Sequence, residues 1–269
     1  MEVPLTKAKL RELRDLARKN HRESSGRFVV DGLRSVREAI ESPFKVLEVF
    51  ATQDLENTAA GQLLVTEARR RMVTMQRVTA REMEQISDTV TAQGVLAIVE
   101  QQHWSVETLL GTPATASLIV ALDAVADPGN LGSVVRTCDW FGAQALILGL
   151  NSVDVHNPKV VRSTMGSLFH IPVLGDVDLP TFLLMAKARG YTVYAAAADG
   201  DVFTDRMTCA AKAVVVLGNE AWGVSDPVNT AADVRLAIRR YGAAESLNVG
   251  VACGILLAAI RQQKNSTGD

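Results

Sequence analysis

Cysteine is scarce in this sequence, and its three copies, Cys138, Cys209 and Cys253, form no CxxC pair. An odd number of widely spaced cysteines excludes a disulfide framework and is typical of a reducing compartment, so we predict a cytoplasmic protein. The four histidines are scattered and lack the spacing of metal ligands. We therefore expect neither a disulfide nor a metal site.

Long hydrophobic segments are also missing. The longest mainly apolar stretch, residues 247–260, is shorter than the roughly 20 residues that a membrane-spanning helix needs. Residues 1–22 are charged throughout, which argues against a secretory signal peptide. Aromatic residues make up only 5% of the chain, so the core must be mostly aliphatic. We expect a globular protein of one large or two ordinary domains, without a membrane partner.

An excess of positive charge is absent overall, because the formal net charge is −2. Residues 1–37 nevertheless carry ten Lys and Arg against five Asp and Glu, so this segment is +5 and the remainder is −7. A basic end on an acidic body is typical of a phosphate-contacting surface, although a solvated helix face has the same pattern. The candidate RNA-binding residues of the first helix are Lys7, Lys9, Arg11, Arg14 and Arg18.

Helix and strand patterns alternate along residues 1–100, which predicts a small α/β domain. The expected helices span 5–19, 34–40, 59–71 and 80–86, and the expected strands span 28–30, 46–51, 73–75 and 94–99. Residues 101–116 contain Gly, Pro and Thr, and we expect a linker there.

A second alternation fills residues 117–269. The expected strands span 117–122, 145–148, 171–173, 192–196, 213–217 and 234–237, and the expected helices span 131–141, 158–165, 179–188 and 247–262. Strands such as SLIVAL and AVVVLG are continuously apolar, which is typical of a parallel sheet covered by helices on both faces. The predicted fold is therefore a parallel-sheet α/β domain preceded by a smaller α/β domain.

Three polar segments follow predicted strands, at the edge of a parallel sheet where ligands bind. In the first, DPGNLGSVVR at 127–136, Asn130 follows a Pro-Gly turn and is well placed as a helix N-cap, with Arg136 nearly two turns further on. The plain alternative is a capped helix with a surface arginine. The segment holds only GxxG of the GxGxxG fingerprint, so a nicotinamide-dependent oxidoreductase is a weakly supported alternative.

The second segment, VLGNEAWG at 216–223, runs from a buried strand into Gly218, which leaves backbone groups open to a ligand, and Glu220, a carboxylate. The third, IRRYGAAESLNV at 238–249, offers Ser246 or Asn248 as the cap of an apolar, buried helix. Ordinary explanations are a strand-to-helix turn with a solvated acid and a capped core helix.

Together the three segments resemble the signature motifs of the SpoU (TrmH-type) RNA 2′-O-methyltransferases of the SPOUT superfamily. The patterns NxGxxxR, LGNExxG and SLNV occur in the family's order, and the stretch RSTMGS at 162–167, which begins with Arg162, resembles another family segment. Residues 1–100 resemble the small RNA-binding domain of many members. The resemblance implies a parallel sheet with a C-terminal trefoil knot, a homodimer, S-adenosylmethionine as cofactor and RNA as substrate.

The resemblance also implies roles for individual residues. Cofactor binding, largely through backbone groups, falls to Leu217, Gly218, Asn219, Ile238 and Leu247. Arg136 is the implied catalytic arginine, and the site is completed by Asn130, Glu220, Ser246 and Asn248. Arg162 joins the implied RNA contacts. The chain departs from the family where Arg239 replaces a common Pro, and Arg240 and Tyr241 are also unusual there.

Two roles are open for Arg136. The family proposal makes the arginine a base for the ribose hydroxyl, but removing a proton from a guanidinium at pH 7 costs about 7 kcal/mol. Clamping a neighbouring phosphate and orienting the ribose is easier physically. The RNA-binding domain favours ribosomal RNA as substrate, and the alternatives are tRNA or a non-catalytic RNA-binding protein that reuses the fold.

Overall fold

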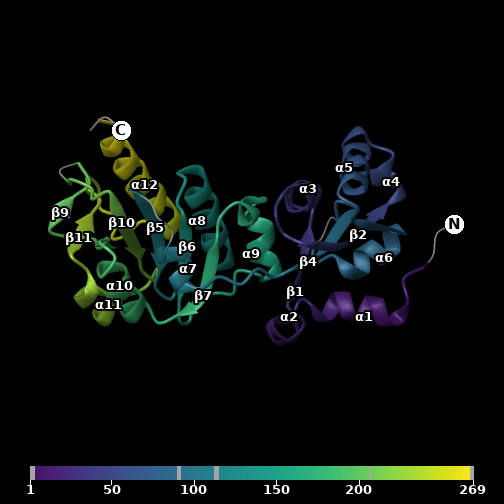
Figure 1. The fold of residues 1–269 in the computed structure, drawn as a ribbon, viewed down its shortest axis with the longest axis horizontal. Coiled ribbons are helices and arrows are strands. Elements are labelled where there is room, and N and C mark those ends of the chain that lie inside the picture. Colours follow the sequence, from purple (N-terminus) through teal and green to yellow (C-terminus); the bar gives the residue numbers. More distant parts are fainter. Residues whose placement is uncertain (1–3, 90–91, 112–114, 206, 267–269) are drawn as a thin grey trace. The chain divides into compact units, whose positions relative to one another are not determined.

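The computed structural model describes residues 4–89, 92–111, 115–205 and 207–266. The chain forms two compact units, one made of Met1–Gln102 with Asp154–His170 and the other of His103–Val153 with Ile171–Asp269. Figure 1 shows the elements of both, and we describe each unit by itself. No helix in the described ranges is long and apolar enough to cross a membrane.

The first unit holds a four-stranded sheet in the order β1-β4-β2-β3. Its strands are β1 (Arg27–Asp31), β2 (Val46–Thr52), β3 (Thr74–Val78) and β4 (Val95–Glu100). Strand β4 is antiparallel to both of its neighbours, whereas β2 and β3 are parallel. The surrounding helices are α1 (Lys7–Asp15), α2 (Lys19–Ser25), α3 (Leu33–Glu41), α4 (Gln53–Glu56), α5 (Ala59–Arg70) and α6 (Ala80–Ile86). The small α/β domain expected at the N-terminus is thus confirmed.

The expectation of one helix over residues 5–19 is wrong, because the chain turns after Asp15 and a second helix begins at Lys19. Arg22, which is buried, holds the turn between the two helices. Its Nη1 donates to the carbonyl oxygens of Leu16 at 2.9 Å and Ala17 at 2.7 Å. These bonds give partners to two carbonyls beyond the end of the first helix and so stabilise the turn there.

Residues Asp154–His170 belong to the second half of the sequence but pack within the first unit. They contain α9 (Pro158–Ser163) and a short 3-10 turn, Ser167–Phe169. The Arg22 guanidinium donates to the Asp154 carboxylate at 2.5 and 3.1 Å. Phe28 lies 6.4 Å from Phe169, ring centroid to ring centroid, and His156 packs on Phe28 at 4.6 Å. A buried ion pair and an aromatic cluster therefore hold this segment.

The second unit contains a seven-stranded sheet in the order β7-β6-β5-β10-β8-β11-β9, with every neighbouring pair parallel. The strands are β5 (Ser117–Leu122), β6 (Ala145–Gly149), β7 (Val173–Val177), β8 (Thr192–Ala196), β9 (Val202–Phe203), β10 (Lys212–Leu217) and β11 (Val234–Ala237). The predicted parallel α/β fold is confirmed. Strand β9, which has two residues, was not predicted, because so short a segment has no period to detect.

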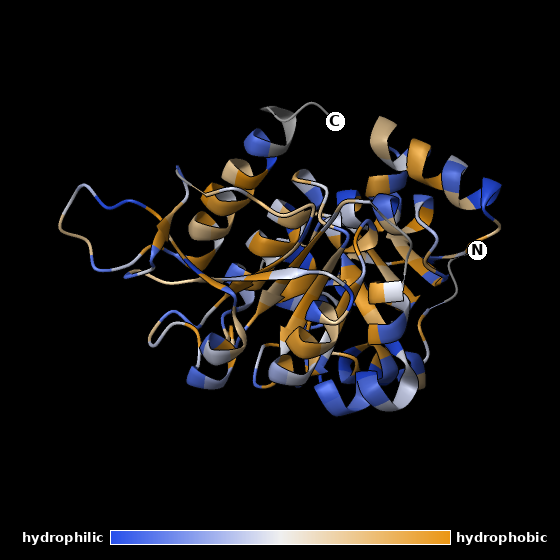
Figure 2. Cartoon of the chain, turned by 60° about the vertical axis from the view of Figure 1, so that its left-hand side comes forward, coloured by the Kyte–Doolittle hydropathy of each residue, from blue (hydrophilic) through white to orange (hydrophobic). Residues whose placement is uncertain are grey.

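Helices cover both faces of this sheet. One face is covered by α7 (Val106–Gly111), α10 (Leu179–Lys187) and α11 (Asp226–Ala231), which share one apolar core with the sheet. On the other face α8 (Pro128–Trp140) and α12 (Val249–Ser266) pack against each other (Figure 1). In Figure 2 the strands are mostly orange and many loops are blue, as burial of the strands requires. Helix α7 lies in the segment expected to be a linker, of which residues 112–114 fall outside the described ranges.

Candidate active site

The three sequence motifs follow β5, β10 and β11. These strands run parallel in one sheet, so their carboxyl ends face the same edge. The loops at that edge comprise residues 123–127, 218–225 and 238–248. This edge is where ligands bind in open α/β sheets.

The cap of α8 differs from the expectation. Asp127, not Asn130, is the N-cap, because its Oδ1 accepts from the Asn130 backbone N–H at 2.8 Å and Pro128 occupies the first helical position. Asn130 is therefore inside the first turn, and its side chain is available for contacts beyond the helix. The prediction that Asn130 caps α8 is wrong, which leaves its side chain for the site in which the family resemblance places it.

Asn130 joins the second and third motifs. Its Nδ2 donates to Glu220 Oε1 at 2.6 Å, and its Oδ1 accepts from Asn248 Nδ2 at 2.7 Å. Asn248 Oδ1 in turn accepts from the backbone N–H of Gly250 at 2.9 Å, so Asn248 is the one of the two candidate caps that caps α12. A directional hydrogen-bond chain thus runs from the start of α12 through two amides to a carboxylate. We call Asn130, Glu220 and Asn248 the polar triad.

The loop after β10 is a tight turn. Asn219 and Gly223 exchange backbone hydrogen bonds of 3.0 and 2.9 Å. The Asn219 side chain donates to the Ala124 carbonyl at 2.7 Å and accepts from the Ala221 N–H at 2.8 Å, which ties the turn to the loop after β5. Asp123, which the sequence analysis missed, adds a second tie by accepting from the Ser225 N–H at 2.8 Å. An acid directly after a buried strand was the available signal.

Gly218 has no room for a side chain. A Cβ atom there would lie 2.0 Å from the Gly223 carbonyl carbon and 2.2 Å from the Val224 nitrogen. The glycine is therefore required by the turn itself, whose backbone folds back over it. Leu217, just before it, is buried, and its carbonyl accepts from the Asp123 N–H at 2.9 Å.

The loop at 238–248 is open. Ile238 is half-buried, whereas Ser246 and Leu247 are exposed. Among the described residues, none forms a backbone–backbone hydrogen bond with the N–H or C=O groups of residues 238–247. The backbone groups of this loop are thus available to a ligand or to water.

Arg136 is not part of the polar triad. It lies on the outer face of α8 and is exposed, and no described side chain forms a hydrogen bond or ion pair with it. Beneath it α8 packs closely on α12, where a Cβ at Gly250 would lie 3.1 Å from the Ser133 Cβ.

Cys138 is buried on the inner side of α8, and burial raises the pKa of its thiol well above the usual range.

The predicted RNA-binding residues differ in availability. Lys9 pairs with Glu48 at 2.7 Å, and Arg14 donates to the Gln85 carbonyl at 3.0 Å, so both are held within the first unit. Arg11 and Arg18 are 85% and 80% exposed, and their guanidinium groups lie 3.6 and 3.5 Å from the Asp15 carboxylate. Lys7 is also exposed. Arg162, in the segment Asp154–His170, is half-buried and lies 4.0 Å from Asp88.

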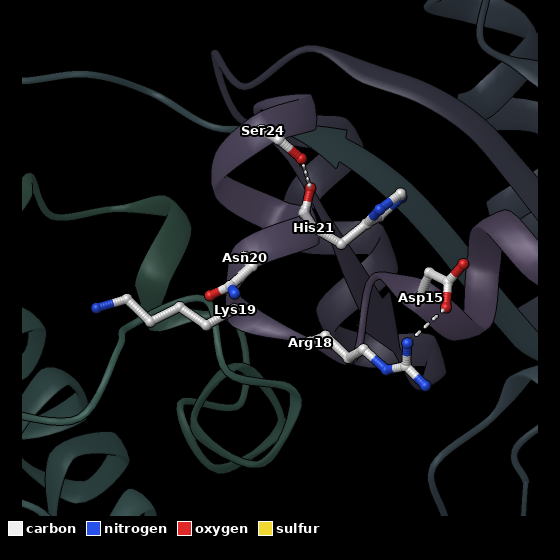
Figure 3. A pocket seen from close by; sticks show the side chains of 6 residues that line it. All are labelled: Asp15, Arg18, Lys19, Asn20, His21 and Ser24. Carbon is white, nitrogen blue, oxygen red and sulfur yellow. Dashed lines mark hydrogen bonds and ion pairs between the residues drawn. The ribbon is translucent and has the colours of Figure 1, made fainter.

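A shallow pocket lies beside Arg18, between the end of α1 and the start of α2. It is lined by Asp15, Arg18, Lys19, Asn20, His21 and Ser24. Figure 3 shows the Arg18 side chain turned toward Asp15 and the Lys19 side chain extending away from it. This corner of the first unit therefore presents cationic groups in two directions.

Two family models match the chain. Residues 117–258 match the SpoU rRNA Methylase family, and residues 7–97 match the MRM3-like substrate binding domain. Among curated proteins, the chain is 33% identical to the 23S rRNA (guanosine(2553)-2′-O)-methyltransferase RlmP of Bacillus subtilis, over 94% of this chain and 96% of that protein. It is 28% identical to the 23S rRNA (uridine(2479)-2′-O)-methyltransferase of Streptomyces viridochromogenes, over 92% and 87%.

Solved structures give the same result. The AdoMet-bound rRNA methyltransferase from Sinorhizobium meliloti superposes with a TM-score of 0.85 at 29% identity, covering 97% of each chain. The similarity therefore extends over both units of the chain.

Proposed function

Because the chain belongs to the SpoU rRNA methylase family, we propose that it transfers a methyl group from S-adenosylmethionine to a ribose 2′-hydroxyl of ribosomal RNA. The observation that carries the proposal is the polar triad. Asn130 is 90 residues from Glu220 and 118 from Asn248, yet direct hydrogen bonds join them at the ligand-binding edge of the sheet. A capped helix with a solvated acid has no need of such an arrangement.

The residues present fit the cofactor. The unpaired backbone groups of Ile238 and Leu247 supply donors and acceptors for a nucleoside, and the tight turn after Gly218 borders the same edge. Leu217, Gly218, Ile238 and Leu247 would hold the cofactor, mainly through their backbone. Asn219 supports this set indirectly, because its side chain is used to hold the turn. When bound, S-adenosylmethionine supplies an activated methyl group on a sulfonium.

The chain's own residues position the ribose. The triad's hydrogen bonds fix the Glu220 carboxylate, which can accept a hydrogen bond from a ribose hydroxyl. Ser246 lies two residues before Asn248, and both residues are exposed. The Arg136 guanidinium is free to take a phosphate in the bidentate manner. Holding two reactants in place can supply about 7–11 kcal/mol of the barrier reduction.

Ribosomal RNA is favoured over tRNA as the substrate. Both curated relatives described above act on 23S rRNA, and the match to a substrate binding domain covers most of the first unit. Arg11, Arg18 and Lys7 are exposed, whereas Lys9 pairs with Glu48 and the exposed Arg14 donates to Gln85, so we assign phosphate contacts to the first three before the other two. Arg162 remains part of the proposed RNA surface.

The test is methyl transfer from labelled S-adenosylmethionine to unmodified ribosomal RNA and tRNA transcripts, followed by alkaline hydrolysis. A 2′-O-methyl group removes the nucleophile that alkali needs to cut the chain, so the label should survive in a dinucleotide from ribosomal RNA. Label in mononucleotides would mean base methylation and would overturn the ribose assignment. Cofactor and RNA binding without transfer would favour the non-catalytic alternative.

Gly218→Ala should abolish S-adenosylmethionine binding. The added methyl group would collide with the backbone at Gly223 and Val224, so the turn must open and the site's edge must move. Isothermal titration calorimetry measures the affinity. Gly175→Ala is the matched control, because a Cβ at that exposed position meets nothing within 4 Å. Normal affinity in Gly218→Ala would show that the cofactor does not depend on this turn.

The trefoil knot and the homodimer implied by the family are part of this proposal. An apolar surface that suits a dimer lies on the outer sides of α8 and α12. Trp140 is 84% exposed, Val251 51% and Ile255 38%, with Leu247 just before α12. Exposed apolar side chains that share neighbouring helices are typical of protein interfaces.

Ile255→Asp should convert the dimer to a monomer, because a charge cannot be buried without a partner at the centre of an apolar interface. Size-exclusion chromatography with light scattering measures the mass. Leu184→Asp is the control, since Leu184 is 62% exposed on α10, which covers the other face of the sheet. A wild-type monomer, or a dimer that tolerates Ile255→Asp, would contradict this assignment of the interface.

A further inference from the structure

Tyr241 differs from the other two tyrosines of the chain. Tyr191 and Tyr194 are buried, and their hydroxyl groups donate to Ser117 Oγ at 2.8 Å and to the Thr208 carbonyl at 3.3 Å. Tyr241 is 90% exposed. Its ring and hydroxyl have no hydrogen-bond or ring partner anywhere in the described part of the chain. An aromatic ring with a polar tip left in solvent is a residue type suited to recognition.

The loop that carries Tyr241 is anchored at both ends. At its start, Arg239 places its guanidinium 4.4 Å above the Phe203 ring centroid and 3.2 Å from an Asp205 carboxylate oxygen. At its end, Asn248 belongs to the polar triad. Tyr241 thus lies between two anchored residues, in the loop that ends at the polar triad.

The charge beside Tyr241 is positive. Asp205 pairs with Arg239. Arg240, in contrast, is exposed and forms no ion pair among the residues that the structure describes. An aromatic face next to an unpaired guanidinium combines the two groups that recognise single-stranded nucleic acid, since the ring stacks on a base and the cation contacts a phosphate. A partner protein with an aliphatic surface would leave the positive charge of Arg240 without a counter-charge.

We propose that Tyr241 stacks on an unpaired nucleobase of the RNA substrate and that Arg240 contacts a phosphate beside that base. The inference rests on the proposed function and adds a specificity-determining contact to it. The target ribose must be accessible, and unpaired nucleotides are the ones whose bases can be splayed onto a protein ring. Tyr241 would thus select RNA in which a nucleotide near the target ribose is unpaired.

The test compares Tyr241→Leu, Tyr241→Phe and Arg240→Gln with the wild type in equilibrium filter binding to an unmodified 23S rRNA transcript. Leucine keeps the apolar bulk but loses the aromatic face, so Tyr241→Leu should bind at least about fivefold more weakly, whereas Tyr241→Phe should stay within about twofold. Arg240→Gln should reduce the slope of log affinity against log salt by about one.

Two further measurements separate this contact from other roles of the loop. S-adenosylmethionine affinity and the mass in solution should be unchanged in all three variants. Wild-type RNA affinity in Tyr241→Leu would overturn the proposal, as would a loss of cofactor affinity, which would place the ring over the cofactor, or a halved mass, which would place it in a dimer interface.

The binding readout does not depend on catalysis. If the wild type binds the transcript but transfers no methyl group, the proposed function fails while the comparison of Tyr241→Leu with Tyr241→Phe still decides the stacking contact. If the wild type does not bind the transcript, both fail.

Discussion

Arg136→Ala is expected to lower the rate of methyl transfer by about 10²- to 10³-fold, the range measured when a positioned electrostatic contact to the reacting groups is removed. The fold should not change, because Arg136 is exposed on α8 and no described side chain pairs with it. Surface substitutions of this kind usually alter stability by less than about 0.5 kcal/mol. The thermal midpoint and the affinity for S-adenosylmethionine should therefore match those of the wild type.

Arg136→Lys separates the two roles of the guanidinium. If Arg136 clamps a phosphate, lysine keeps the charge but loses the bidentate geometry, so the KM for RNA rises and kcat is partly retained. If Arg136 takes the proton from the ribose hydroxyl, the rise of kcat with pH moves to lower pH in Arg136→Lys, because an amine loses its proton more readily than a guanidinium, while the KM stays constant. The exposed position of Arg136 favours the clamp, because nothing in the described structure shields the guanidinium from water.

The control for this experiment is Arg189→Ala, which removes another exposed arginine of the second unit from a position after α10. It should transfer methyl groups at the wild-type rate. An Arg136→Ala variant that is as active as this control would remove Arg136 from the catalytic machinery and leave the polar triad and Ser246 as the assigned groups.

The position of the site could be predicted from sequence, because it follows from local patterns. Continuously apolar strands predict a parallel sheet, and polar residues placed directly after such strands must gather at one edge. Glu220 was selected this way, whereas Asn248 was offered as a helix cap and placed in the site by the family resemblance; hydrogen bonds through Asn130 join the two.

The cap of α8 was wrongly placed at Asn130, although the signal for the correct cap was present. Asp127 and Asn130 are both good N-caps, but proline is favoured at the first position of a helix, and Pro128 follows Asp127 directly. Applying that rule would have placed the cap at Asp127 and left the Asn130 side chain for the site.

The packing of Asp154–His170 within the first unit could not be predicted, because no local rule pairs residues so far apart in sequence. Arg22 and Asp154 are separated by 132 positions. The break after Asp15 was missed for another reason, since the sequence from 5 to 19 has a helical period, and periodicity does not register that Arg22 donates to the carbonyls of Leu16 and Ala17 a few residues earlier. One buried arginine thus stabilises two features that periodicity misses, one through local contacts and one through a long-range contact.

Asp154→Ala is accordingly expected to destabilise the first unit by about 3–5 kcal/mol, the range found when one partner of a buried ion pair is removed. The Arg22 side chain is 2% exposed and that of Asp154 18% exposed, so the remaining guanidinium would be left without a counter-charge and largely without water. Because the chain has two units and a single transition is not assured, hydrogen exchange of α2 and β1 amides is the appropriate measurement.

Asp88→Ala is the matched control for that change. Asp88 also faces an arginine of the segment Asp154–His170, namely Arg162, but at 4.0 Å and with a side chain that is 57% exposed. Removing the Asp88 carboxylate should therefore lower the free energy of unfolding by less than about 1 kcal/mol. Asp154→Asn, which keeps an acceptor but loses the charge, should fall between the two. Equal hydrogen-exchange protection in Asp154→Ala and Asp88→Ala would mean that the aromatic contacts of Phe28 and Phe169 hold the segment without help from the ion pair.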